Sequence, residues 1–167
     1  MIGLMPSMGA GEAGRGSARQ TLADFALPSE PGNEQRAMER VVEAIKELDL
    51  SDRRLERLKT AVAEATMNAM EHGNDYRPEA PVAIQVFASE TALWVRITDE
   101  GGGAPIPEPE SPDLEAKLAS RQAPRGWGLF LIQNMVDEMC ITGDEAYHTV
   151  ELILRLEGDD LASQKTP

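Results

Sequence analysis

The sequence EATMNAMEHGN, from Glu64 to Asn74, ends a long predicted helix and begins the loop after it. Glu64, Asn68 and His72 follow one another at intervals of four residues, so they stack along one edge of that helix. The apolar residues of the helix recur at intervals of three and four and form its buried stripe: Leu55, Leu58, Val62, Ala65 and Ala69. Glu64 and Asn68 therefore lie at the rim of the packed face, and Gly73 is placed to end the helix as a C-cap.

A carboxylate and an amide at a helix rim form either solvated surface or part of a polar site, and this segment alone leaves both open. A second stretch bears on the choice, because Asp99 ends an apolar strand and is followed by Glu100 and the glycines Gly101 to Gly103. Glycine allows a backbone to approach a ligand closely, and a carboxylate accepts a strong hydrogen bond from an exocyclic amine such as that of adenine. The same residues also suit an ordinary tight turn.

A third stretch, Arg125-Gly126-Trp127-Gly128, stands just before a predicted helix. A glycine-rich helix entry exposes the N–H groups of the first turn, which form a ready anion site. A plain junction between loop and helix is the alternative. The spacing matches neither the phosphate loop, with its Lys and Ser or Thr, nor the Gly-x-Gly-x-x-Gly dinucleotide fingerprint.

Composition narrows the class of protein. The chain has 167 residues, which predicts one domain over residues 19–157 between a disordered leader (1–18) and a polar tail (158–167). Its formal net charge of −13 argues against direct nucleic-acid binding and against an anionic membrane as partner. A single cysteine, Cys140, excludes an internal disulfide, and neither a signal peptide nor a membrane span of ~20 apolar residues is present. These features predict a cytoplasmic protein.

Periodicity predicts the order of the secondary structure. Residues 20–27 form a short strand, residues 34–48 a helix, and the second helix starts at the N-cap Ser51. Two hairpins follow, one over residues 82–98 and one over residues 139–156, separated by a proline-rich connection and a helix. This order predicts an α+β protein with a two-layer α/β sandwich, a mixed but mainly antiparallel sheet and helices on one face. His148 falls at the turn of the last hairpin and is expected on the surface.

The three stretches are far more specific together than separately. In order they read Glu-x-x-x-Asn-Ala-x-x-His-Gly, Asp-x-Gly-x-Gly and Arg-Gly-x-Gly-Leu-x-Leu-Ile. The chain resembles the GHKL (Bergerat-fold) ATP-binding superfamily on these motifs, and within it the bacterial anti-sigma regulatory factors, a branch of serine-protein kinases. The resemblance covers about residues 20–157 and implies the Bergerat fold with ATP and Mg²⁺ as cofactors.

The resemblance also implies roles for individual residues. Asn68 is expected to ligate Mg²⁺ through its side-chain oxygen, and Glu64 to act as the general base for the attacking hydroxyl. Asp99 is expected to bind the adenine amine, with Gly101 and Gly103 shaping the pocket around the base. The phosphates are expected to meet the third motif at the residues Arg125, Gly126, Gly128 and Leu129. The connection from Ala104 to Pro124, with a short helix at Leu114–Ala119, is expected to be the ATP lid.

ATP binding alone leaves two functions open. The first is a serine/threonine protein kinase that phosphorylates an anti-sigma antagonist of the STAS type and also sequesters a sigma factor. The alternative is a non-catalytic module in which nucleotide orders a surface that captures a protein partner. The sequence favours the first because Glu64 is present, and it leaves open whether the protein forms a homodimer.

Overall fold

The computed structural model describes residues 18–102 and 125–156, with the backbone alone for residues 125–127. The elements in chain order are β1 (Gln20–Leu27), α2 (Asn33–Ala44), α3 (Asp52–Asn68), the π-helical turn η1 (Ala69–Gly73), β2 (Val82–Ala88), β3 (Ala92–Asp99), α5 (Arg125–Gln133), β4 (Glu138–Gly143) and β5 (His148–Arg155). The strand, the helices and the two hairpins predicted from the sequence are all present within these ranges. Gly103, the connection at 104–124 and most of the predicted leader and tail lie outside them.

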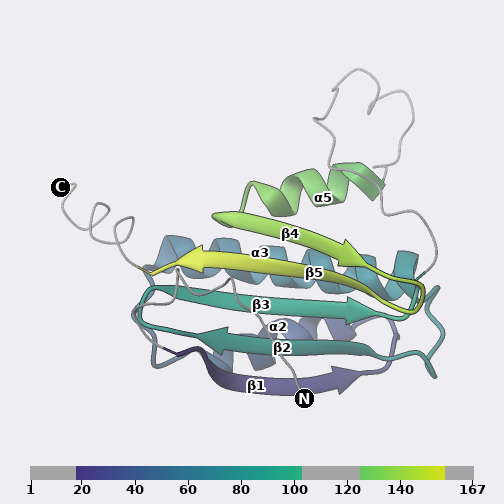
Figure 1. The fold of residues 1–167 in the computed structure, drawn as a ribbon, viewed down its shortest axis with the longest axis horizontal. Coiled ribbons are helices and arrows are strands. Elements are labelled where there is room, and N and C mark those ends of the chain that lie inside the picture. Colours follow the sequence, from purple (N-terminus) through teal and green to yellow (C-terminus); the bar gives the residue numbers. More distant parts are fainter. Residues whose placement is uncertain (1–17, 103–124, 157–167) are drawn as a thin grey trace, which may run out of the picture.

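The strands form one sheet in the order β1-β2-β3-β5-β4 (Figure 1). Every pairing among the described strands is antiparallel, so the sheet is more regular than the mixed sheet expected from the sequence. Strands β2 and β3, and likewise β4 and β5, follow one another directly as hairpins. Strands β1 and β2 are connected through α2 and α3, and β5 returns beside β3 after α5 and β4. The central strand β3 pairs with β2 on one side and with β5 on the other, and it carries Asp99 at its end.

The helices cover one face of this sheet, which confirms the two-layer α+β architecture. Figure 1 shows α2 and α3 behind the strands, and α5 lies beside α3 and next to the edge strand β4. Alternate residues of β2 and β3 point into this layer and are fully buried, as strand periodicity predicts. They meet the apolar stripe of α3, and the largest buried side chains include Leu58, Ile84, Leu93, Ile97 and Leu152.

The two long helices differ in how closely their ends match the sequence expectation. Ser51 is the N-cap of α3, and its hydroxyl accepts a hydrogen bond from the Arg54 N–H at 3.2 Å. Helix α2 stops at Ala44, about one turn before the predicted end at Leu48. The chain must reverse before α3 begins, and Ile45 already leaves helical geometry with φ of −107°. Leu48 still packs against the core from the connecting turn.

The end of α3 departs from the prediction that Gly73 is a C-cap. The helix widens into η1, where the Asn74 N–H bonds to the Ala69 carbonyl at 2.9 Å, five residues earlier. The residues in the left-handed region are Asp75, with φ of 54°, and Tyr76, with φ of 51°. The chain reversal therefore comes after Gly73, whose lack of a side chain serves another purpose described below. None of the helices in the described ranges is both long and apolar enough to cross a bilayer.

Candidate functional site

The first group of predicted site residues meets where α5 crosses the edge of α3. A Cβ built on Gly128 would lie 3.1 Å from the Glu64 Oε2 and 3.2 Å from the Asn68 Nδ2. Gly128 therefore packs closely on two side chains that lie about sixty positions earlier in the sequence, and its lack of a side chain permits this approach of α5 to α3. We call Glu64, Asn68 and Gly128 the Glu64 cluster.

Asn68 is the least satisfied polar side chain of this cluster. Its Nδ2 is buried, and the described residues offer that atom no hydrogen-bond partner. A buried amide without a partner costs free energy, so such groups in native proteins commonly serve a ligand or a water molecule. The amide oxygen and nitrogen can exchange places by a flip of the side chain, so either can be presented to a ligand.

Glu64 is partly buried and accessible from a second direction. Burial, and then the negative charge of Glu71, raise the pKa of the Glu64 carboxyl above its ordinary value. A groove of about 400 Å³ runs between α2 and α3 and is lined by Met38, Ala63 and Met67 as well as Glu64. Glu64 therefore lines this groove while its Oε2 also approaches Gly128 of α5, and its pKa is shifted in the direction that suits a base.

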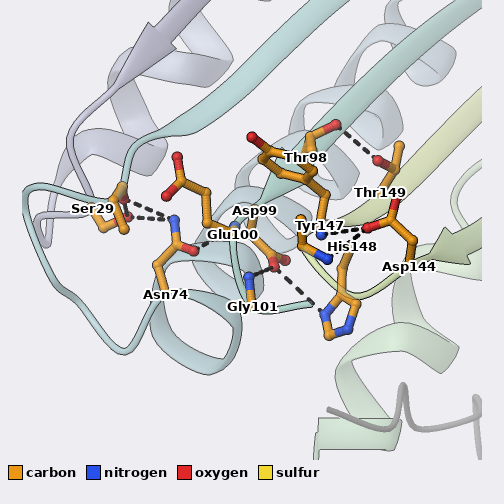
Figure 2. Close-up of polar contacts among 12 residues, drawn as sticks. Ser29, Asn74, Thr98, Asp99, Glu100, Gly101, Asp144, Tyr147, His148 and Thr149 are labelled. Carbon is orange, nitrogen blue, oxygen red and sulfur yellow. Dashed lines mark hydrogen bonds and ion pairs between the residues drawn. The ribbon is translucent and has the colours of Figure 1, made fainter. Parts of the chain in front are cut away.

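The second group of site residues surrounds the end of β3. The Asp99 Oδ1 accepts a hydrogen bond from the Gly101 N–H at 2.8 Å and lies 3.5 Å from the His148 Nδ1 (Figure 2). A Cβ on Gly73 would lie 2.2 Å from the Asp99 Cγ, so only glycine allows η1 to approach the carboxylate this closely. We call Gly73, Asn74, Asp99, Gly101 and His148 the Asp99 cluster.

Asn74 is a positioning residue to which the sequence analysis gave no role. It is fully buried, and its Nδ2 lies within hydrogen-bond distance of the Ser29 hydroxyl and the Ala80 carbonyl, at 3.0 and 2.8 Å. Its Oδ1 accepts a hydrogen bond from the Glu100 N–H at 2.7 Å (Figure 2). Asn74 thus ties the loop after β3 to the segments that follow β1 and precede β2.

His148 was predicted to lie on the surface, and that prediction is wrong. Its exposed fraction is 5%, because β5 begins at this residue and pairs it directly with Asp99. The sequence held one signal for this pairing. Arg96 and Glu151 carry opposite charges, stand opposite one another in the register and form an ion pair at 2.9 Å. Counting three residues outward from that pair places His148 beside Asp99.

The remaining predicted residues divide into three groups. Arg125 and Gly126 are the first two residues of α5, so their backbone N–H groups belong to its first turn. The Leu129 side chain is buried in the core, with an exposed fraction of 5%, so a contact with a ligand would involve its backbone. Gly103 lies outside the described residues. Gly102, for which the sequence predicted no separate role, packs closely on the backbone of Ala146.

The two clusters belong to one continuous edge, because α3 runs directly into η1 and Gly73 is five residues beyond Asn68. A sequence comparison gives this arrangement a family. Residues 27–154 match the histidine kinase-like ATPase domain. The chain belongs to this family. The matched range covers both clusters and all three motifs.

Curated relatives lie in the branch of the family that the motifs suggested. The chain is 33% identical over 118 residues to the anti-sigma F factor of Bacillus cytotoxicus, covering 70% of this chain and 80% of that protein. It is 30% identical over 113 residues to the anti-sigma F factor of Geobacillus stearothermophilus, covering 67% and 76% of the two chains. The predicted relation to anti-sigma regulatory factors is confirmed.

Two solved structures share the fold. One contains the RsbU and RsbW domains of a Mycobacterium tuberculosis protein, with a TM-score of 0.54 and 19% identity over 80% of this chain and 32% of that longer chain. The other is the SiaB–SiaC complex of Pseudomonas aeruginosa, with a TM-score of 0.52 and 15% identity over 81% of this chain and 90% of the matched one. At these identities the likeness supports the fold assignment.

Proposed function

We propose that this chain is an ATP-binding anti-sigma regulatory factor that phosphorylates a serine or threonine of a STAS-type antagonist protein and binds a sigma factor. The observation that carries the proposal is the position of Glu64. Its carboxyl lines an open groove, approaches Gly128 in the predicted phosphate-binding motif and has a raised pKa. The names of the relatives support the anti-sigma role, since they are anti-sigma F factors.

In this proposal the Asp99 cluster binds the base of ATP. The Asp99 carboxylate accepts the hydrogen bond of the adenine amine, and Gly101 and Gly103 form the wall of the pocket. The phosphates extend along α3 toward the start of α5. There the N–H groups of the first turn, from Arg125, Gly126 and Gly128, and the backbone of Leu129 face them, which is favourable for anions at a helix N-terminus.

Asn68 is the protein ligand that we propose for Mg²⁺. Its amide sits within reach of the same space as Gly128 and has a buried nitrogen that no described residue binds, so the side chain can turn its oxygen to an ion. No three His, Cys, Asp or Glu side chains gather as a cation site within residues 18–102 and 125–156. A single amide oxygen from Asn68 suits Mg²⁺, because this ion takes few protein ligands and completes its octahedron with phosphate oxygens and water. When bound, Mg²⁺ neutralises phosphate charge.

The reaction that follows is phosphoryl transfer. The acceptor hydroxyl oxygen forms a bond to the γ-phosphorus, its proton passes to the Glu64 carboxylate, and the bond from phosphorus to the β–γ bridging oxygen breaks to leave ADP. The groove between α2 and α3 gives a protein segment a path to Glu64 that does not cross the nucleotide. This path favours a kinase over a module that only captures a partner.

Replacing the carboxyl of Glu64 tests the proposal. Glu64→Gln keeps the size of the side chain but cannot take up the proton, so we expect transfer of the γ-phosphoryl group to fall by about 10²–10⁴-fold. The dissociation constant of Mg-ATP should stay within about twofold, because Glu64 takes no part in holding the nucleotide. Transfer is measured with radiolabelled ATP on the antagonist that co-purifies with the chain, and binding by calorimetry.

Glu56→Gln is the matched control, since Glu56 lines the same groove and its side chain is paired with Lys59. It should transfer at the parental rate. Parental transfer by Glu64→Gln would rule out Glu64 as the base. A parental protein that captures the antagonist only with Mg-ATP, yet never phosphorylates it, would instead support the non-catalytic module.

A further inference from the structure

The groove between α2 and α3 has a chemical character that indicates what it binds. Its volume of about 400 Å³ lies at the lower end of the roughly 300–1,000 Å³ that is typical of binding pockets. Met38 of α2 faces it, together with Ala63 and Met67 of α3. Methionine is flexible and polarisable, so this part of the groove can adapt to apolar side chains of different shapes.

Three carboxyl groups give the groove a negative charge. Glu34 and Glu64 line it, and Glu71 is near enough for its charge to raise the pKa of the Glu64 carboxyl, although burial is the larger cause. Burial, and then the charges of Glu71 and Glu34, also raise the pKa of the Tyr76 hydroxyl. The two shifts have Glu71 as a common cause, so the three glutamates act on one region. We call Glu34, Glu64 and Glu71 the groove acids.

The charge of the groove acids is not neutralised by the protein. Among residues 18–102 and 125–156, no lysine or arginine forms an ion pair with any of them. Lys59 also lines the groove, but its Nζ lies 3.1 Å from the Glu56 carboxylate and is paired there. His72 lies 3.8 Å from Glu71 and carries a charge only when it is protonated. The groove is therefore complementary to a cation.

The geometry favours a cation that belongs to a protein side chain over a free metal ion. In the part of the chain that the structure describes, no three His, Cys, Asp or Glu side chains come close enough together to hold a metal ion. A lysine or arginine carries its charge at the end of an apolar stem, which can lie along apolar surface such as that of Met38 and Met67. A basic protein segment thus matches both the apolar and the charged part of the groove.

We propose that this groove recognises a basic segment of the protein substrate. A Lys or Arg side chain of the segment binds beside the groove acids, an apolar neighbour packs on Met38 and Met67, and the acceptor serine or threonine reaches Glu64. The inference rests on the proposed function, because the segment is phosphorylated only if Glu64 acts as the base. It deepens that function by naming the chemical class of the substrate. A bound cation also favours the ionised form of Glu64, so docking of a basic segment prepares the base.

Synthetic peptides test the inference. Each peptide contains one serine, one leucine and one arginine, with the arginine at successive positions on either side of the serine. A matched set has citrulline in place of arginine, which keeps the shape of the side chain and removes its charge. Fluorescence anisotropy of labelled peptides measures binding to the full chain. The best arginine peptide should bind about tenfold more tightly than its citrulline counterpart.

Two variants locate the peptide. The double substitution Glu34→Gln with Glu71→Gln removes two charges with little change in size, so it should bind arginine and citrulline peptides equally. Glu39→Gln is the matched control, because Glu39 is an exposed residue of α2 that does not line the groove. This control should keep the tenfold preference. Thermal melts establish that each variant is folded, and the comparison of the two peptide sets on the parent requires no variant.

Equal binding of both peptide sets by the parent, or no binding of either, would overturn the inference. A preference for arginine that survives in the folded double variant would overturn it as well. Transfer of phosphate from radiolabelled ATP to the co-purifying antagonist separates this result from the fate of the proposed function. A parent that phosphorylates the antagonist but shows no preference for arginine contradicts the basic segment alone. A parent that prefers arginine through the groove acids but transfers no phosphate supports the docking of a basic segment and contradicts the kinase.

Discussion

The Asp99 cluster and the Glu64 cluster lie along the same edge of α3 and η1, yet their polar atoms are treated in opposite ways. In the Asp99 cluster, Asn74 and Asp99 make hydrogen bonds to three segments of the chain, at Ser29, at Ala80 and at Glu100–Gly101. In the Glu64 cluster, the Asn68 nitrogen has no partner among the described residues and the Glu64 carboxyl is held at a raised pKa. The polar atoms of the Asp99 cluster have protein partners, whereas the Asn68 nitrogen of the Glu64 cluster has none among the described residues.

This difference agrees with the proposal that one nucleotide binds across both clusters. A base is recognised by a few hydrogen bonds of fixed direction, so its pocket gains from being rigid before the ligand arrives. Phosphates and a metal ion bring their own charge and donors, so protein groups that wait for them stay partly unsatisfied. Each prediction below compares a substitution in one cluster with a similar substitution in the other cluster or at a control position. The predictions follow in order of decreasing expected effect.

The largest effect is expected from Asn74→Ala. The substitution removes a buried amide whose oxygen binds the Glu100 N–H and whose nitrogen reaches the Ala80 carbonyl. The Glu100 N–H loses its acceptor, the Ala80 carbonyl keeps only the Ser29 hydroxyl as a side-chain donor, and a fully buried side chain is truncated, so we expect the free energy of unfolding to fall by about 3 kcal/mol. Urea denaturation of the parent and the variant measures this difference.

Asn134→Ala is the control for that substitution. Asn134 is exposed, and among the described residues its side-chain amide bonds to the Phe130 carbonyl of its own turn, so its loss should change the free energy of unfolding by less than about 0.5 kcal/mol. Equal losses for the two asparagines would show that the Asp99 cluster is no more tightly built than the surface.

Adding one methyl group to each cluster gives the next contrast. In Gly73→Ala the new Cβ would stand 2.2 Å from the Asp99 Cγ, so the variant should lose about 2 kcal/mol of stability and most of its affinity for ATP. In Gly128→Ala the nearest atoms are the ends of the Glu64 and Asn68 side chains at 3.1 and 3.2 Å, which can move by a few tenths of an ångström.

Gly128→Ala should therefore fold with at least parental stability, since alanine is favoured over glycine inside a helix by about 1 kcal/mol. Its phosphoryl transfer should fall by about tenfold, because the added methyl displaces the ends of the Glu64 and Asn68 side chains. Thermal melts measure the stability of Gly73→Ala and Gly128→Ala, and transfer assays measure their rate of phosphoryl transfer. A stable Gly73→Ala protein with parental ATP affinity would refute the close packing of η1 on Asp99.

Asn68→Ala should show the reverse of Asn74→Ala. The amide makes no hydrogen bond to a described residue through its nitrogen, so the free energy of unfolding should change by less than about 0.5 kcal/mol. The affinity for ATP in the presence of Mg²⁺ should fall by about tenfold, while the affinity in EDTA should not change. Calorimetric titrations with and without Mg²⁺ separate the two. Identical heats for parent and variant in Mg²⁺ would exclude Asn68 as a metal ligand.

The fold could be predicted from periodicity because its elements are amphipathic. The period of two in β2 and β3 and the apolar stripe of α3 each place one face in the core, and the structure buries those faces. The end of α3 could not be predicted in the same way. Whether a glycine caps a helix or makes room for a neighbour depends on what packs against it, and Asp99 is distant from Gly73 in the sequence.

The Glu64 cluster was predictable in composition, and the structure brings its three residues together. The Asp99 cluster was predicted only in part, since Asn74 and His148 act through contacts between strands and loops that have no local signature. Sheet register decides which side chains stand opposite one another, and a shift of one residue would have turned His148 to the other face. The roles of Glu64, Asn68 and Asp99 toward a nucleotide stay predictions.

The smallest effect expected is on the pH dependence of stability, and it comes from Glu64. Because its pKa is raised in the folded protein, the native state keeps this proton at pH values where the unfolded chain has released it. Stability contributed by the protonated carboxyl is present below the unfolded pKa and is lost as the pH rises to the folded pKa. Glu64→Gln removes this titration, so the parent should lose stability relative to the variant over that interval. The carboxyl is only partly buried, so the loss should stay below about 1 kcal/mol.

Urea denaturation of parent and variant at pH values from the ordinary carboxyl range up to neutrality measures the relative loss, with Glu56→Gln as the control at an exposed position. Glu71→Gln should narrow the interval, because the charge of Glu71 is the second cause of the raised pKa. If the free energies of unfolding of the parent and of Glu64→Gln changed with pH in parallel, the folded protein would not raise the pKa of the Glu64 carboxyl. Glu64 would then have no tuned basicity, and the contrast between a satisfied Asp99 cluster and a waiting Glu64 cluster would rest on Asn68 alone.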